Sequence, residues 1–128
     1  MRGNRFHNRI ARKAQMIFER FGWQVFMEHR FQANGTTKYF DLFAENPPDK
    51  IVCEIETTVR HAIDNARKAQ AVGVPVWFVV PTQKVKRQIV RKLTTPGVMP
   101  GNKLIKVLLL GQLEGELAHY LSRRKPIN

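Results

Sequence analysis

The sequence predicts an α/β fold in which helices flank a mixed central sheet, and three features of the chain carry this prediction. Apolar residues recur at helical spacing over residues 5–21, which is typical of an amphipathic helix. Residues 32–37 contain Asn-Gly between two strand-like runs, a strong signal for a β-hairpin. Residues 74–81 form a continuous apolar run after a second helical segment, as expected for a strand covered on both faces.

The first helix is defined by its apolar stripe and by the glycine that follows it. The stripe consists of Phe6, Ile10, Ala14, Ile17 and Phe21. Gly22 ends the helix, and most of its basic residues fall off the stripe. The strands predicted at 23–31 and 38–45 then return on each other as an antiparallel hairpin.

A third strand is predicted at 50–57, after a turn at 45–49 that contains Pro-Pro. Thr57 and Thr58 then offer an N-cap for a second helix, which ends at Gly73. The small-residue face of this helix, which can lie close against a sheet, consists of Ala62, Ala66 and Ala69.

The C-terminal part continues the alternation of helix and strand. Its predicted elements are a helix at 82–93, a loop at 94–102, a strand at 103–110 and a helix at 112–124. A hairpin with a third strand, followed by a helical crossover into a buried strand, predicts a mixed sheet. We expect a single domain over residues 1–128, with a core at about 5–80 and an αβα extension at 82–123.

The composition favours a soluble protein with a polyanionic partner. The chain has 22 Lys and Arg against 10 Asp and Glu, a formal net charge of +12, which is typical of nucleic-acid-binding proteins. Its longest apolar runs are far shorter than a membrane span requires, and the N-terminus lacks the apolar segment of a signal peptide. Cys53 is the only cysteine, which favours an intracellular, cytoplasmic location and leaves no internal disulfide.

Three carboxylates fall within otherwise apolar strands. Glu54 and Glu56 are two residues apart and therefore share a strand face, and Asp41 lies on the preceding strand, across the turn. Carboxylates at that density repel one another unless a cation neutralises them, and oxygen ligands favour Mg²⁺ or Mn²⁺. The alternative is an exposed face of an edge strand, which the apolar residues around Glu54 argue against.

These residues resemble the motif of the PD-(D/E)xK nucleases, which have the restriction-endonuclease-like fold with an αβββαβ core. The matching strings are Asp41, Glu54-Ile-Glu56-Thr-Thr and Asn65-Ala-Arg-Lys68, within residues 5–80. Archaeal-type Holliday junction resolvases of this superfamily are similar in size and basicity. The resemblance implies a metal-dependent DNA endonuclease that is structure-selective and resolvase-like.

The resemblance also implies a role for each matched residue. Asp41 and Glu54 would be metal ligands, and Glu56 would be a third ligand or the base that orients the attacking water. Lys68 would stabilise charge on the transferring phosphate. Its alternative is a solvated lysine, about ten residues and roughly 15 Å into its helix.

The sequence departs from the motif in two places. Glu56 stands where the usual pattern has lysine, so a second reading is a catalytically degenerate, DNA-binding subunit of a larger complex. The junction-cleaving members carry a glutamate on the first helix, and the corresponding position here falls near Ala11. His7, near the start of that helix, and Asn65, which shares a helix face with Lys68, are accessory candidates.

Basic residues of two helices are the candidates for DNA contacts. They are Arg5, Arg9, Arg12 and Lys13 on the first helix and Lys84, Lys86, Arg87, Arg91 and Lys92 on the third. A third basic run consists of Arg123, Arg124 and Lys125. Solvated helix faces are the alternative for each set. We expect the protein to recognise the backbone or the shape of branched or duplex DNA. Cutting two strands would need two active sites, so we expect a homodimer. Net charge alone would equally allow RNA as the partner.

Overall fold

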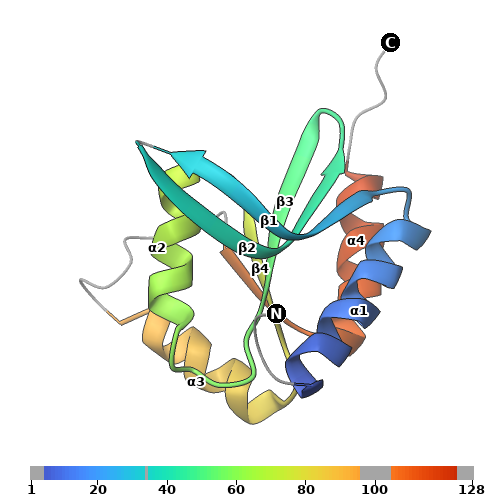
Figure 1. The fold of residues 1–128 in the computed structure, drawn as a ribbon. Helices are drawn as coiled ribbons and strands as arrows, with labels where there is room; N and C mark the ends of the chain where they lie inside the picture. Colours follow the sequence, from blue (N-terminus) through green and yellow to red (C-terminus); the bar gives the residue numbers. More distant parts are fainter. Residues whose placement is uncertain (1–4, 34, 96–104, 124–128) are drawn as a thin grey trace.

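The protein is described by a computed structural model over residues 5–33, 35–95 and 105–123. Its elements are α1 (Arg5–Arg20), β1 (Gln24–Ala33), β2 (Thr36–Asn46), β3 (Asp49–Ile55), α2 (Ala62–Val72), β4 (Val76–Val80), α3 (Gln83–Leu93), β5 (Ile105–Leu109), the 3₁₀ turn η1 (Leu110–Gln112) and α4 (Leu113–Ser122). This order confirms the predicted α/β class and its αβββαβ core (Figure 1).

The five strands form one mixed sheet in the order β1-β2-β3-β4-β5. The first three strands are antiparallel neighbours, and β4 and β5 continue the sheet in parallel with β3. Since β3 lies in the middle, the alternative of an exposed edge strand carrying Glu54 and Glu56 is wrong. The parallel pairing of β5 with β4 places the C-terminal extension in the same sheet as the core.

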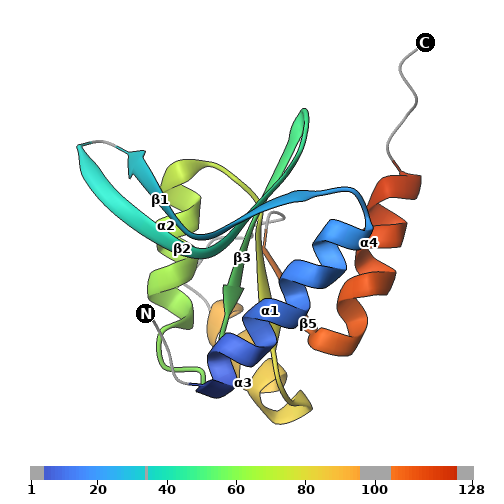
Figure 2. The same ribbon diagram turned by 45° about the vertical axis from the view of Figure 1, so that its right-hand side comes forward.

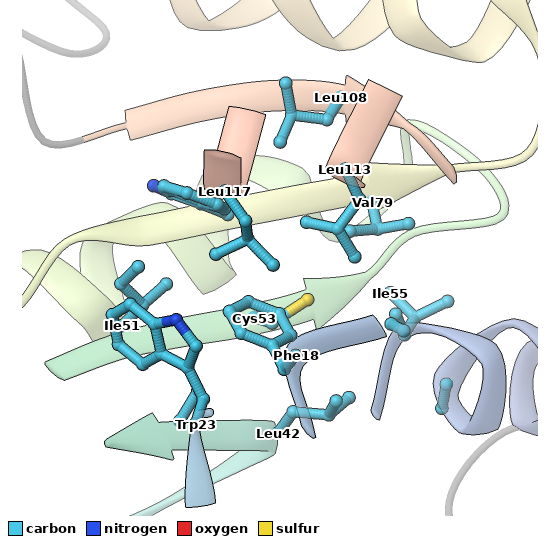
Figure 3. Packing of buried hydrophobic residues seen from close by; sticks show 14 of the residues in the cluster. Phe18, Trp23, Leu42, Ile51, Cys53, Ile55, Val79, Leu108, Leu113 and Leu117 are labelled. Atoms are coloured by element: carbon cyan, nitrogen blue, oxygen red, sulfur yellow. The ribbon is translucent and has the colours of Figure 1, made fainter. Parts of the chain in front are cut away.

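One face of the sheet is covered by α1 and α4, which also contact each other (Figure 1). Ala14 and Phe18 of α1 and Leu117 of α4 are fully buried there. Of the predicted helical stripe, Ile10 and Ala14 are buried but Phe6 is exposed, so that prediction is confirmed only in part. Figure 3 shows Phe18 beside Trp23 and Cys53 and above Leu42. Trp23 and Trp77 both belong to this core.

The opposite face is covered by α2 and α3. Ala62 and Ala66 are fully buried, so α2 lies close to the sheet as its small residues predict. Ile89 and Leu93 of α3 pack in the same cluster, together with Phe78 of β4. Every residue of β4 is buried, as expected for a strand covered on both faces.

The start of α2 differs from the prediction. The segment 57–61 forms a bend and a turn, and the helix begins at Ala62, so Thr57 and Thr58 are not its N-cap. The Thr58 hydroxyl instead accepts a hydrogen bond from the Arg60 N–H at 3.3 Å. Such a local bond offers the backbone an alternative to the helix and delays its start.

Some expectations fall on residues outside the described ranges. These are most of the loop at 94–102, the first two residues of the strand at 103–110, and Arg124 and Lys125 of the terminal basic run. Within the described ranges, no helix combines the length and the apolar character that crossing a membrane requires.

Candidate active site

The central feature of the site is a fork between β2 and β3. Their regular pairing reaches Leu42 opposite Cys53, and Asp41 and Glu54 stand at the next position of that register. Here the side chains replace the backbone ladder. The Asp41 N–H donates to Glu54 Oε1 at 2.9 Å, and the Ile55 N–H donates to Asp41 Oδ2 at 2.8 Å. Both carboxylates are thereby fixed in orientation, because each accepts a buried backbone donor that needs a partner.

Glu54 is the most deeply buried of the acids, with 1% of its surface exposed. Its Oε2 has no hydrogen-bond partner, although Lys68 Nζ lies 3.6 Å away. Burial, and then the charge of Asp41, raise the pKa of Glu54 to about 7, against a lowering by Lys68. A buried, charged oxygen without a hydrogen bond is costly, and it marks a place where a cation or a donor would be bound favourably.

Glu56 lies just beyond the end of β3 and is held from α2. Its N–H donates to the Val79 carbonyl of β4 at 3.0 Å, so the backbone still belongs to the sheet. Asn65 Nδ2 donates a short hydrogen bond to Glu56 Oε1. Burial raises the pKa of Glu56 to about 7, while the bond from Asn65 opposes the shift. The structure therefore brings Asn65, an accessory candidate, into contact with a predicted catalytic residue.

Lys68 reaches the same fork from the second turn of α2. Its Nζ donates a short hydrogen bond to the Tyr39 carbonyl of β2, and it lies 4.9 Å from the centroid of the Phe40 ring. Its side chain is only 14% exposed, so the alternative of a solvated lysine is wrong. The expected distance along the helix was too long because α2 begins at Ala62 and not at Thr58.

His7 closes the site from the first turns of α1. Its Nε2 lies 3.2 Å from Asp41 Oδ2, and its Nδ1 lies 3.2 Å from Asn8 Oδ1. The contact with Asp41 raises the pKa of His7, and burial partly opposes that shift. The glutamate that the resemblance expects near position 11 is absent, and Ala11 is buried. His7, one helical turn earlier, is the α1 side chain that contacts the acids.

These side chains line a pocket of about 400 Å³. Its walls consist of His7, Asp41, Glu54, Ile55, Glu56, Thr57, Thr58, His61, Asp64 and Asn65. Four polar wall residues, Thr57, Thr58, His61 and Asp64, are not among the site residues predicted from the sequence. Their position directly after Glu54-Ile-Glu56, in the segment between a strand and its crossover helix, is the signal that could have identified them.

The donor set suits a hard divalent cation. Asp41, Glu54 and Glu56 supply only oxygen atoms, and Glu54 Oε2 is a buried oxygen without a hydrogen bond. Within the described residues, however, no three His, Cys, Asp or Glu side chains are grouped as a complete metal site. One reason is that backbone N–H groups and Asn65 already bind an oxygen of each acid. The residues fit the ion chemically, and binding it would require the carboxylates to turn.

The candidate DNA-contacting residues lie on helices that cover opposite faces of the sheet. Arg5, Arg9, Arg12 and Lys13 of α1 are all exposed. On α3, Lys84, Arg87, Arg91 and Lys92 are exposed, but Lys86 Nζ donates to Gln112 Oε1 at 2.8 Å. Lys86 therefore also ties α3 to η1.

Several solved structures share this fold, among them the following two. One is a protein of unknown function, AF1548, with a TM-score of 0.55 and 14% identity, covering 92% of this chain and 68% of that chain. The other is the small subunit, R.BspD6I2, of the heterodimeric restriction endonuclease R.BspD6I, with a TM-score of 0.54 and 11% identity, covering 94% of this chain and 73% of that chain. No family model matches the sequence. No curated protein matches it either. The fold is thus that of a restriction endonuclease subunit, which confirms the restriction-endonuclease-like class.

Proposed function

We propose that this protein is a metal-dependent DNA endonuclease that hydrolyses phosphodiester bonds in the pocket at the β2–β3 fork. The observation that carries the proposal is the convergence of Asp41, Glu54 and Glu56 in a buried position beside Lys68. Burying three acids around a central strand destabilises a fold, and it is typical of a site that needs their charge. The fold shared with a restriction endonuclease subunit and the net charge of +12 support DNA as the substrate.

The residues divide the work according to their contacts. Asp41 and Glu54 would hold Mg²⁺ or Mn²⁺, with Glu56 as a third ligand. When bound, the ion polarises a phosphate oxygen and lowers the pKa of a water. Alternatively, Glu56, with its pKa raised to about 7, can take the proton of the attacking water. The hydrogen bond from Asn65 orients the Glu56 carboxylate for this role. Lys68 supplies positive charge beside Glu54, and His7 holds Asp41 from the α1 side.

The finer proposal is a structure-selective, resolvase-like enzyme acting on branched or duplex DNA. The described ranges contain little beyond the sheet and four helices, and the exposed basic residues suit phosphates more than base edges. Cutting both strands requires two sites, so we propose a homodimer; the R.BspD6I structure is that of one subunit of a heterodimeric enzyme. Sedimentation as a monomer, both alone and on branched DNA, would contradict this assembly.

Cleavage of labelled DNA tests the activity directly. A four-way junction, a flap, single-stranded DNA and linear duplex would each be incubated with Mg²⁺, Mn²⁺ or EDTA. Asp41→Asn keeps an oxygen acceptor for the Ile55 N–H but removes the charge, so cleavage should fall by at least about a hundredfold while the fold is retained. Asp49→Asn, on the same hairpin but outside the pocket, is the matched control. Cleavage that persists in EDTA or in Asp41→Asn would contradict the proposal.

A second candidate function is a non-catalytic, DNA-binding subunit. The observation in its favour is the reciprocal bonding of Asp41 and Glu54 to backbone N–H groups, since this gives both acids a structural role without a metal. Titration with Mn²⁺, followed by its paramagnetic resonance signal, separates the two functions. The nuclease should bind Mn²⁺ in a manner that Asp41→Asn abolishes, whereas a pure binding module need not bind it. Competition between duplex RNA and duplex DNA tests the remaining choice of nucleic acid.

A further inference from the structure

A second concave site lies between α1 and the edge strand β1. It is a groove of about 340 Å³ between α1 and β1, lined by Asn8, Ala11, Arg12, Gln15, Met27 and Glu28. The four α1 residues follow the spacing i, i+3, i+4 and i+7, so they form one face of the helix. Figure 2 shows α1 and β1, which are consecutive in the chain and in contact with each other. Nothing in the proposed catalytic steps uses this groove.

The groove is joined to the active site by two neighbouring residues of α1. Asn8 lines the groove, and its Oδ1 lies 3.2 Å from Nδ1 of His7, which lines the catalytic pocket and contacts Asp41. Glu28 stands opposite Asp41 in the register of the β1–β2 pairing, at a position where the regular pairing is interrupted. The groove and the catalytic pocket are therefore neighbours, both along α1 and across the β1–β2 pairing.

The lining of the groove is mixed in a way that suits a nucleobase. Met27 is 37% exposed and offers an apolar surface, and Ala11 adds a small apolar floor. Gln15 and Glu28 offer hydrogen-bonding groups of the kind that pair with base edges, and Arg12 offers a cation for the attached phosphate. A phosphate alone would be repelled by Glu28. The volume of the groove lies in the range of sites that bind one small organic group.

The backbone supports a specialised role for the same place. Glu28 has φ of 49°, in the left-handed region that residues with a Cβ enter rarely. Such strain lowers the stability of the folded protein, and strained residues are found most often at binding and catalytic positions. Across the same kink, Met27 pairs with Leu42 and His29 pairs with Phe40, so the strand remains in register. The distortion therefore interrupts the pairing at Glu28 alone and leaves the register on both sides unchanged.

We propose that this groove binds one unpaired nucleotide of the DNA strand, next to the phosphate held in the catalytic pocket. Met27 packs against the face of the base, Gln15 and Glu28 contact its edge, and Arg12 contacts its phosphate. The inference rests on the proposed action on DNA and deepens it, since it specifies a substrate with an unpaired nucleotide beside the cut. A fully paired duplex does not fill the groove, because its bases are stacked and paired.

The test is a binding measurement in EDTA, where no cleavage occurs. Fluorescence anisotropy would compare a duplex carrying one unpaired nucleotide with the same duplex carrying an abasic residue at that position. The wild-type protein should bind the intact DNA about tenfold more tightly, as expected for one stacked base. The double variant Gln15→Ala, Met27→Ala should bind both DNAs with the same, weaker affinity. Equal binding of the two DNAs by the wild-type protein would overturn the proposal.

Two matched controls keep the result specific. Met16→Ala removes the same side chain from an exposed position of α1 that does not line the groove, and it should retain the tenfold preference. Arg12→Ala should weaken binding of both DNAs more than Lys13→Ala, since both residues are exposed but only Arg12 lines the groove. A preference that survives in the double variant, or is lost in Met16→Ala, would contradict the site. The binding preference is measured without cleavage, so this test can fail even if the protein cuts DNA and can succeed even if it does not.

Discussion

The buried part of β3, together with Glu56 just beyond its end, has two halves that are held in place by different interactions. The first half is apolar and consists of Ile51 and Val52, and the second half, after Cys53, runs from Glu54 to Glu56. Val52 in the first half has no exposed surface, pairs with Phe43 on β2 and with Val76 on β4, and packs among apolar side chains. Glu54 in the second half is 1% exposed, but its position is paired only toward β4. On the β2 side, hydrogen bonds from backbone N–H groups to the Asp41 and Glu54 carboxylates replace the usual backbone–backbone hydrogen bonds between strands.

The difference shows how a buried strand can be stable at one end and reactive at the other. Apolar burial stabilises the first half at every pH, since it contains no group that titrates in the ordinary range. In the second half burial has the opposite effect, because it raises the pKa of both glutamates to about 7. The stability of the fork should therefore depend on pH and on cations, and that of the first half should not.

The largest effect on stability is expected from placing a charge in the apolar half of β3. Val52→Asp places a carboxylate where neighbouring strands leave neither a donor nor a cation nearby, and we expect a loss of about 4 kcal/mol or more of unfolding free energy. Circular dichroism and gel filtration should show an unfolded or aggregated protein. A folded Val52→Asp protein would mean that the two halves tolerate charge alike.

The next effect comes from neutralising an acid of the fork. Below about pH 4.5, Glu56 is protonated in the folded and the unfolded protein, and its contribution to stability is fully present. As the pH rises through about 7, the unfolded chain loses the proton first, so stability falls by about 3 kcal/mol. Glu56→Gln keeps an oxygen for Asn65 and should remove this loss.

Denaturant unfolding between pH 5 and pH 8 measures that change. The wild-type protein should lose stability with rising pH, Glu56→Gln should lose less, and the two should converge toward the acid end. Added Mn²⁺ should restore stability to the wild-type protein at pH 8. Identical pH profiles for the two proteins would show that burial does not govern the ionisation of Glu56.

A smaller effect is expected from removing the cation beside Glu54. Lys68→Met keeps much of the packing over Phe40 but loses the charge 3.6 Å from Glu54 Oε2 and the donor to the Tyr39 carbonyl. We expect a cost of about 2 kcal/mol at pH 8 and less at pH 5, because a protonated Glu54 does not need a counter-charge. Chemical denaturation at both pH values measures it, and Lys13→Met, exposed on α1, is the control. An equal cost at both pH values would mean that the lost hydrogen bond to the Tyr39 carbonyl explains the effect and the lost charge near Glu54 does not.

The smallest effect concerns the strained position opposite Asp41. Glu28→Gly relieves a left-handed backbone but adds freedom to the unfolded chain, so the net gain should be about 0.5 kcal/mol. Thermal melting should show a slightly more stable protein, with Glu45→Gly on β2 destabilised as the comparison. A destabilised Glu28→Gly protein would mean that interactions of the carboxylate outweigh the strain.

The sequence was sufficient for most of the fold because local and global signals agree in it. The helical stripe, the Asn-Gly turn and the apolar run of β4 each specify an element without reference to the others. The grouping of Asp41 with Glu54 followed from strand spacing and one short turn. The sequence could not predict the start of α2, because Thr58 uses its hydroxyl for a local turn and not for a cap.

The remaining parts of the site depend on tertiary geometry. The reciprocal bonds of Asp41 and Glu54 require β2 and β3 to diverge, and no local pattern signals that divergence. His7 meets Asp41 only because α1 packs across the sheet in one particular direction. The groove beside β1 depends on the left-handed Glu28, a residue type that gives no warning of such a conformation.

The reciprocal bonds at the fork also have an evolutionary consequence. A descendant without the proposed nuclease activity would still need Asp41 and Glu54 to join its two strands, so selection for folding alone would retain them. Glu56 does not join β2 to β3, since its backbone N–H is bonded to β4 and, among the described residues, its side chain accepts a hydrogen bond from Asn65. Among relatives of this protein, the residue at the position of Glu56 is therefore the better record of whether the chemistry has been kept.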